Sequence, residues 1–412
     1  MPTPSFPPEI ISAILEEIPG KTRYSPPPRT SWATCCLVSK SFLPIAQALL
    51  YREVRLDWEM TMAPTRFQLV KRSQLLLASL VGNPDLAVLV KTLNIEVPGH
   101  GDERLKENSE ALTVCTAITD LRLFLPSPSS PMPSTFERAI AGLGPQLKSL
   151  EISGGAWKPK SPEWLANFRC LKRLSMTHTY GYLDPRPSPP AFELERFAGS
   201  QNMTKPVEFS AVTFMLSSSH SSLLELDLSW STFPTVFDLS AFTALKTFRL
   251  ASMFSSAEKA HAASTSLSAL VKSFAVLEEF SLSAMMRFGP TPALEDVDIL
   301  RSFPSTLKSL EFSFIPFKTA YLLDVLADPR CLPSLKSFDL DYKVKSEGDG
   351  ETRVVPRPRH ELNEITRAAK ERGFEIDSEA LEEGRRLRIK DLVLRQVTAI
   401  STDDKSERPI VH

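Results

Sequence analysis

Histidine and cysteine, the residue types that most often bind metals or act as nucleophiles, are few and dispersed in this sequence. The six histidines and five cysteines do not occur at metal-binding spacings such as His-x-x-x-His. Phosphate-binding glycine loops, dinucleotide-binding patterns and nucleophile elbows are also absent from the sequence. We therefore expect no enzymatic activity, no metal and no cofactor. The residues concerned are His100, His178, His220, His261, His360, His412, Cys35, Cys36, Cys115, Cys170 and Cys331.

The sequence contains one run of basic residues, from Arg385 to Lys390, that could bind a negatively charged partner. Such a run is typical of a nuclear-localisation or nucleic-acid-binding patch. It is equally typical of a solvated helix face, here balanced by Glu379, Glu382 and Glu383. The net charge of −1 and pI of about 6.6 give no overall positive field. We therefore favour the second interpretation and expect neither nucleic acid nor a membrane as partner.

Composition indicates a folded protein from a reducing compartment. Hydrophobic residues make up 42% of the 412 positions, enough for a substantial core. The cysteines are odd in number and scattered, as expected of reduced thiols. The N-terminus lacks a basic region followed by an apolar one. We expect a cytoplasmic or nuclear protein.

A short pattern, apolar-x-x-apolar-x-apolar, recurs nine times. The first apolar positions of successive copies are 28, 29, 24, 52, 22, 32, 30 and 28 residues apart. The interval of 52 predicts one further, degenerate copy between Leu183 and Ser210. The copies begin at Val90, Ile118, Leu147, Leu171, Leu223, Leu245, Leu277, Leu307 and Leu335.

A period of this length with this pattern is the signature of leucine-rich repeats. Each copy supplies one short strand whose apolar side chains are buried only when copies stack. We predict an irregular α/β solenoid with a parallel sheet and helical or irregular returns on the other side. The alternative is a coincidental run of strands in an ordinary α/β domain.

Acidic residues dominate the strand positions expected on the concave side. Nine acids stand against Arg122, Arg173 and Arg249, which predicts a groove for a basic partner. A column of lysines just before the strands could instead neutralise that field. The acids are Glu96, Asp120, Glu151, Glu225, Asp227, Glu279, Glu311, Asp339 and Asp341.

The first fifty residues predict three helices of about ten residues each. The first begins at Pro7 and Pro8, the second is capped by Thr30 or Ser31 and carries Leu37 and Val38, and Pro44 opens the third. Such a unit is too small to be stable alone, so it needs a neighbour in its own chain or in a partner.

This segment resembles an F-box. The resemblance lies in Phe6-Pro7-Pro8-Glu9-Ile10, Ile14-Leu15 and Leu37-Val38-Ser39-Lys40-Ser41-Phe42, with Phe6 in place of the usual Leu and a proline-rich insertion from Gly20 to Arg29. With the repeats behind it, the chain is similar to substrate receptors of cullin-based ubiquitin ligases, particularly divergent fungal forms. The resemblance implies docking on a Skp-family adaptor and a solenoid that binds an unknown protein substrate. It assigns adaptor contacts to Phe6, Pro7, Glu9, Ile10, Ile14, Leu15, Leu37, Val38, Lys40 and Phe42.

The alternative is a protein-binding scaffold without a ubiquitin role, in which the N-terminal helices only cap the solenoid. In either case we expect three parts: an F-box-like domain at 1–56, the solenoid at 57–377, and a charged helix with a disordered tail at 378–412. Within them we predict a strand at 51–56, a helix at 62–83, a helix from Glu361 to Arg372 stopped by Gly373, an edge strand from Phe374 to Ile376, and a helix from Ser378 to Val397. Surface loops or poorly ordered insertions are predicted at 126–134, 185–190 and 345–359, and a disordered tail from Ser401.

Overall fold

A computed structural model of the chain is an α/β structure with two compact units. The first comprises residues 1–194 and 215–218, and the second comprises residues 195–214 and 219–412. The division falls inside the segment that the sequence pattern treats as one solenoid. The structure describes residues 7–16, 29–56, 66–97, 102–125, 134–154, 167–177, 190–200, 209–230, 239–252, 257–284, 294–313, 315, 317–340, 343–348, 351–356, 358–376 and 387–391.

The first unit contains five strands that pair in parallel and in chain order. The strand predicted at 51–56 is present from Glu53 onward, because its first two residues belong to α3. The next four strands contain the first four copies of the repeat. The strands are β1 (Glu53–Leu56), β2 (Thr92–Glu96), β3 (Asp120–Leu125), β4 (Ser149–Gly154) and β5 (Arg173–Thr177).

The second unit contains six more parallel strands in chain order. The first of them, β6 (Arg196–Ser200), confirms the degenerate copy predicted between Leu183 and Ser210. The others hold the last five copies: β7 (Glu225–Trp230), β8 (Thr247–Ser252), β9 (Glu279–Ala284), β10 (Ser309–Ser313) and β11 (Ser337–Leu340).

Each of the nine copies forms a strand that begins two residues after its first apolar position. The pairing register aligns the second apolar positions, as in Leu121 with Leu150 and in Phe248 with Phe280. Those side chains are buried, and aromatic rings contact one another along the second unit in tilted pairs: Phe280 lies 5.8 Å from Phe248 and 5.9 Å from Phe312 between ring centroids. One repeated apolar position thus builds a continuous core, as a solenoid-like fold requires.

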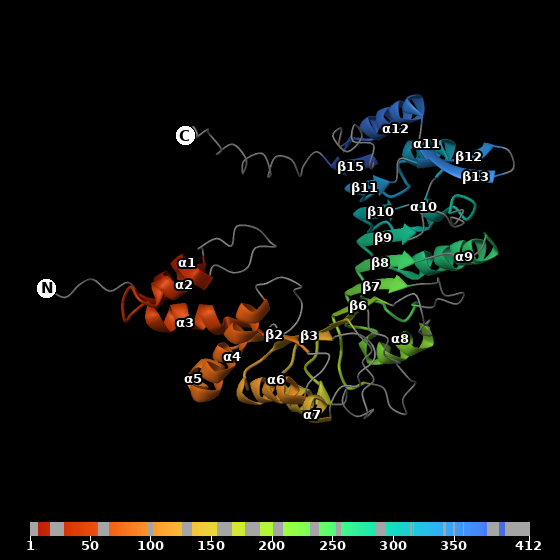
Figure 1. Cartoon of the computed structure of the whole chain (residues 1–412). Coiled ribbons are helices and arrows are strands. Elements are labelled where there is room, and N and C mark those ends of the chain that lie inside the picture. Colours follow the sequence, from red (N-terminus) through yellow and green to blue (C-terminus); the bar gives the residue numbers. More distant parts are fainter. Residues whose placement is uncertain are drawn as a thin grey trace, which may run out of the picture. The chain divides into compact units, whose positions relative to one another are not determined.

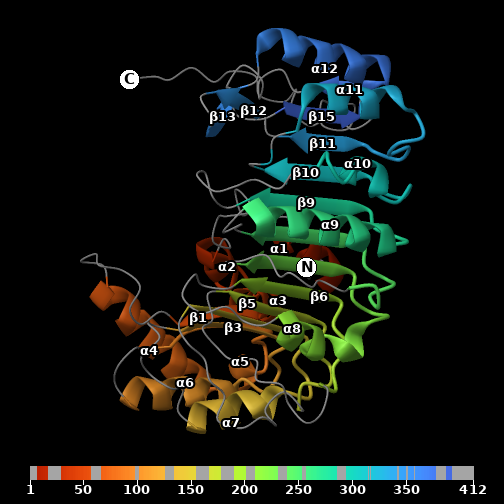
Figure 2. The same cartoon turned by 90° about the vertical axis from the view of Figure 1, so that its right-hand side faces the viewer.

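Helices return the chain between strands and cover one face of the sheet. In the second unit α9, α10 and α11 lie on the same side of the strands in both views (Figures 1 and 2), and in the first unit α6 and α7 pack against each other. The helix predicted at 62–83 is present as α4. These helices are α4 (Arg66–Gly82), α5 (Pro84–Ala87), α6 (Asp102–Val114), α7 (Ser134–Leu143), α8 (Phe209–Met215), η2 (Ser217–Ser219), α9 (Ala257–Ser273), α10 (Ile299–Ser302) and α11 (Thr319–Ala327).

Three helices precede β1: α1 (Pro8–Glu16), α2 (Arg29–Cys35) and α3 (Leu43–Arg52). The carbonyl of Pro7 accepts the first hydrogen bonds of α1, and a proline lies in the first turn of α3, as predicted. The prediction for the second helix was wrong at both ends. The helix begins before Thr30, which is therefore not its cap. It ends at Cys35, so Leu37 and Val38 lie in the turn that follows.

The C-terminal end departs most from prediction. Helix α12 (Arg359–Glu371) and strand β14 (Phe374–Ile376) are present as expected, and Gly373 between them has a φ of +86°. The helix predicted from Ser378 to Val397 is wrong where the structure describes it, because Leu387–Asp391 forms strand β15. Leucine and isoleucine alternate with basic residues there, a strand period, and β15 pairs antiparallel with both β11 and β14.

The loop predicted at 345–359 is also wrong. Strands β12 (Lys343–Gly348) and β13 (Glu351–Pro356) form an antiparallel pair in which Val344 stands opposite Val355. The β-branched residues favour a strand, although the prolines and glycines around them indicated a loop. Predicted features at residues 17–28, 126–133, 185–189 and beyond 391 lie outside the described residues.

Candidate functional site

The N-terminal helices share a small core of their own. Ile11 and Leu15 from α1 and Ala46 from α3 are buried together. The indole Nε1 of Trp32, on α2, donates a hydrogen bond to the carbonyl oxygen of Leu15 over 3.1 Å. All three helices are therefore tied to one centre by either burial or this bond.

Large apolar side chains remain exposed on the same helices. Leu37 is 86% exposed and Val38 63% exposed, in the turn after α2. On α1, Ile10 is 46% exposed and Ile14 48% exposed. Because exposing apolar area to water is unfavourable, several such side chains on one small helical group are typical of a protein-binding surface.

The ten predicted adaptor contacts fall into three groups. Pro7, Glu9, Ile10, Ile14, Leu37, Val38 and Lys40 are exposed. Leu15 is 1% exposed and Phe42 is half-buried against the same core, so these two hold the helices together and are not a free surface. Phe6 lies outside the described residues. The sequence pattern did not single out Trp32 or the exposed Leu43; the tryptophan type alone was a signal for the former.

In each unit the second candidate surface is the sheet face that carries the outward strand residues, and we call it the ladder face of that unit. Its acids form ion pairs with arginines one or two strands away. Glu151 pairs with Arg122 at 3.4 Å, and Asp120 pairs with Arg173 at 2.7 Å. In the second unit the pairs are Glu225 with Arg196 at 3.0 Å and Glu279 with Arg249 at 3.1 Å.

The lysines that precede the strands also neutralise acidic residues, as the sequence indicated. Glu278, just before β9, lies between Lys308 at 2.6 Å and Lys246 at 3.4 Å. The hydrogen bond from Lys308 and the two nearby positive charges lower the pKa of Glu278 below its ordinary value. The lysines and arginines therefore offset much of the acidic surplus counted along the strands.

Three other acids predicted to line the groove are not in the ion pairs described above. Glu311 accepts hydrogen bonds from Ser281 and from Ser313, each at 3.2 Å. Partial desolvation raises the pKa of Asp227, and the charge of Arg249 opposes that rise. Asp339 is half-buried on β11. The ladder face is thus a surface of alternating, mutually paired charges with hydroxyl groups between them.

Sequence reasoning missed Arg196, the partner of Glu225, because β6 departs from the repeat pattern. The register places Arg196 opposite Glu225. The doubled interval between neighbouring copies was the available signal in the sequence.

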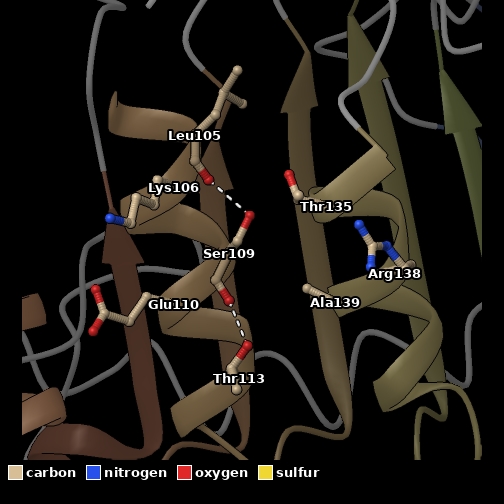
Figure 3. Close-up of a pocket in the computed structure, with 8 residues that line it drawn as sticks. All are labelled: Leu105, Lys106, Ser109, Glu110, Thr113, Thr135, Arg138 and Ala139. Atoms are coloured by element: carbon tan, nitrogen blue, oxygen red, sulfur yellow. Dashed lines mark hydrogen bonds between the residues drawn. The ribbon is translucent and has the colours of Figure 1, made fainter. Parts of the chain in front are cut away.

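A groove lies between α6 and α7 on the helical side of the first unit (Figure 3). Its lining mixes charged and hydroxyl side chains from both helices, and its volume is about 900 Å³. The lining residues are Leu105, Lys106, Ser109, Glu110, Thr113, Thr135, Arg138 and Ala139. Ser109 and Thr113 donate hydrogen bonds to their own helix, so those hydroxyls are already engaged.

Within the described residues, no three His, Cys, Asp or Glu side chains gather as metal ligands. In that same part of the chain no helix is long and apolar enough to cross a bilayer. Comparison with known families and with curated proteins finds no match to this chain.

Proposed function

We propose that this protein is the substrate-recognition subunit of an SCF-type E3 ubiquitin ligase. The N-terminal helices would act as an F-box that docks on a Skp-family adaptor, and the leucine-rich-repeat solenoid would bind the target protein. The observation that carries the proposal is the exposure of Leu37 and Val38, which lie in the motif that resembles an F-box, in the turn after α2. The three N-terminal helices around them are followed by ten copies of a parallel repeat.

The residues of the proposed adaptor surface would act in two ways. Ile10, Ile14, Leu37 and Val38 would be covered by the adaptor, since burial of such side chains contributes about 1.5–3 kcal/mol each. Leu15 would act indirectly, by holding α1 in place through the buried core. The chain itself would perform no covalent step: it would raise the effective concentration of a target near the ubiquitin-charged enzyme.

The target would bind the ladder face. The charges on that face already form ion pairs between strands. A target would therefore gain affinity only if its own polar groups complement the arrangement of these pairs and of the hydroxyl groups between them. Mismatched surfaces would leave charges desolvated and unpaired, which gives selectivity more than strength.

The test is co-purification of the full chain with a Skp-family adaptor. Leu37→Asp and Val38→Asp should each abolish capture. The matched controls are Leu75→Asp and Val88→Asp, because these residues are 61% and 47% exposed but lie on and beside other helices. Failure of the native chain to capture any adaptor would remove the ligase proposal.

A second candidate is a protein-binding scaffold whose N-terminal helices cap the repeats. The observation in its favour is that α3 runs directly into β1 and contacts both β1 and α5. The carbonyl of Arg52, at the end of α3, accepts a hydrogen bond from the amide of Lys91 over 3.0 Å. On this alternative Leu37→Asp leaves all partner binding intact, since no adaptor covers that side chain.

A further inference from the structure

The residue just before each repeat strand belongs to a column that follows the amino ends of the strands. In the second unit this column carries Lys246, Glu278 and Lys308, before β8, β9 and β10. The carboxylate of Glu278 bridges its two neighbours: Oε2 lies 2.6 Å from Lys308 Nζ, and Oε1 lies 3.4 Å from Lys246 Nζ. A carboxylate in the middle of three successive column positions is thus held by the lysines on both sides.

The first unit has the same arrangement of lysines without the carboxylate. Lys91, Thr119 and Lys148 occupy the column before β2, β3 and β4. Among the residues that the structure describes, the ammonium group of Lys148 has no hydrogen-bond or ion-pair partner. The ammonium group of Lys91 donates only a long hydrogen bond of 3.5 Å, to the carbonyl of Val88. Two cations therefore flank a middle position that carries no negative charge.

The backbone around the two middle residues has the same hydrogen bonds. The carbonyl of Thr119 accepts hydrogen bonds from the amides of Lys148 and of the residue after it, at 2.8 and 3.0 Å. The carbonyl of Glu278 accepts the same two bonds from Lys308 and the residue after it, at 2.7 and 3.0 Å. Because side chains leave matching strand backbones in the same direction, the lysines of the first unit flank Thr119 as those of the second flank Glu278.

The acid that follows the middle residue is also equivalent in the two units. Asp120 accepts a hydrogen bond from the hydroxyl of Thr119 at 2.8 Å and pairs with Arg173 at 2.7 Å. Glu279 pairs with Arg249 at 3.1 Å. In both units this negative charge is already matched by an arginine, so it does not replace the carboxylate between the lysines.

We propose that the sheet edge around Thr119 is a docking site for an acidic protein segment, one of whose carboxylates is held between Lys91 and Lys148. Neighbouring strands lie about 4.8 Å apart, so the two lysine stems begin about 10 Å apart and both can reach one carboxylate. The occupant is a carboxylate because Glu278 shows that group in this setting, and the net charge of −1 gives no general field for nucleic acid. The site lies at the strand ends, and the proposal does not depend on the ubiquitin-ligase proposal.

The test measures binding of a fluorescent hexaglutamate peptide to the full chain by anisotropy at low ionic strength. Thr119→Glu supplies the carboxylate from the chain itself, so it should weaken peptide binding by about threefold or more. Thr119→Gln, which has the same shape without the charge, is the matched control and should bind like the native chain. Lys91→Gln combined with Lys148→Gln should weaken binding to the same extent as Thr119→Glu.

The second unit provides the reverse experiment. Glu278→Thr reproduces the first-unit arrangement there and should add a second peptide site, which a further Lys246→Gln removes. Equal binding by folded Thr119→Glu and Thr119→Gln chains would overturn the proposal. If circular dichroism shows that Thr119→Glu does not fold, unchanged binding by the double lysine variant overturns it instead. Tighter binding of an oligothymidylate that depends on Lys91 and Lys148 would also overturn it, because the occupant would then be a nucleic acid.

Discussion

Trp32 and Leu15 are joined by a hydrogen bond of 3.1 Å from the indole nitrogen to the backbone carbonyl, which ties α2 to the last turn of α1. Carbonyls at a helix C-terminus have no partner within the helix, so this bond satisfies one of them. It also explains how a short α1, with Ile11 and Leu15 as its buried residues, is held against its neighbours.

Replacing Trp32 by Phe should loosen α1 because the ring remains and the donor is lost. The expected cost is about 1 kcal/mol, which corresponds to roughly fivefold faster hydrogen exchange of the α1 amides if they exchange by local opening. Ser12→Ala, which removes only an exposed side-chain contact to Glu16, is the control and should leave exchange unchanged. Equal exchange in Trp32→Phe and native protein would show that the bond does not hold the helix.

Phe280 should be among the most costly core residues to truncate. Its ring lies within 4.8–5.9 Å of the rings of Phe248, Phe303 and Phe312, and its side chain is 2% exposed. Phe280→Ala should destabilise the protein by about 3–5 kcal/mol, measured by urea unfolding, since it leaves a cavity between strands. Phe124→Ala, at a position 43% exposed, should cost far less. Comparable losses for the two would contradict the stacked core.

Two glycines should respond to alanine in opposite directions. Gly154 has a φ of +79°, and a β-carbon there would lie 2.2 Å from the carbonyl oxygen of Leu125. Gly142, in helix α7, has nothing within 4 Å of that position. Gly154→Ala should therefore destabilise by more than about 1 kcal/mol, whereas Gly142→Ala should stabilise by about 0.5–1 kcal/mol. Thermal unfolding of both variants checks the signs, and a destabilising Gly142→Ala would be the contrary result.

Alkaline pH should weaken the first unit through Cys115. Burial raises the pKa of this thiol to about 11 from 9.0, so the folded state holds the proton more tightly than the unfolded state. The contribution is fully present below pH 9 and is lost as pH rises through 11, on the order of 2 kcal/mol. Urea unfolding at pH 8 and pH 11 should therefore show a smaller pH effect in Cys115→Ala than in the native chain. An equal effect in both would mean that this thiol is not responsible.

The Arg249–Glu279 pair should matter little for stability. Both side chains are about half exposed, and exposed pairs contribute roughly 0.2–1 kcal/mol. A double-mutant cycle with Arg249→Ala and Glu279→Ala should give a coupling in that range, falling with added salt. The swapped pair, Arg249→Glu with Glu279→Arg, should regain most of it. A coupling of several kcal/mol would contradict an exposed, solvent-screened ladder face.

The strands of the repeat could be predicted from the sequence, whereas β12, β13 and β15 could not. An apolar residue at the first position of each copy is followed two residues later by a strand in all nine cases, because a period-two pattern can bury its apolar side chains only in a sheet. Even the weak copy at β6 was predictable from the doubled interval. The order of the parallel strands followed from the same repetition, since each copy needs its neighbour to cover its core.

Which residues of the predicted motifs are exposed could not be predicted from the sequence and follows from the folded chain. Leu15 and Leu37 belong to the same motif, yet one is buried and the other is 86% exposed, because the path of the turn after α2 determines which side chains face the core. The charges of the ladder face are paired with opposite charges one or two strands away. These partners are far apart in the sequence, so no local sequence pattern predicts the pairs. Residues 387–391 form a strand because of their neighbours in the fold. Their own charges suit a solvated helix, but the free edges of β11 and β14 offer backbone hydrogen bonds that an isolated segment lacks.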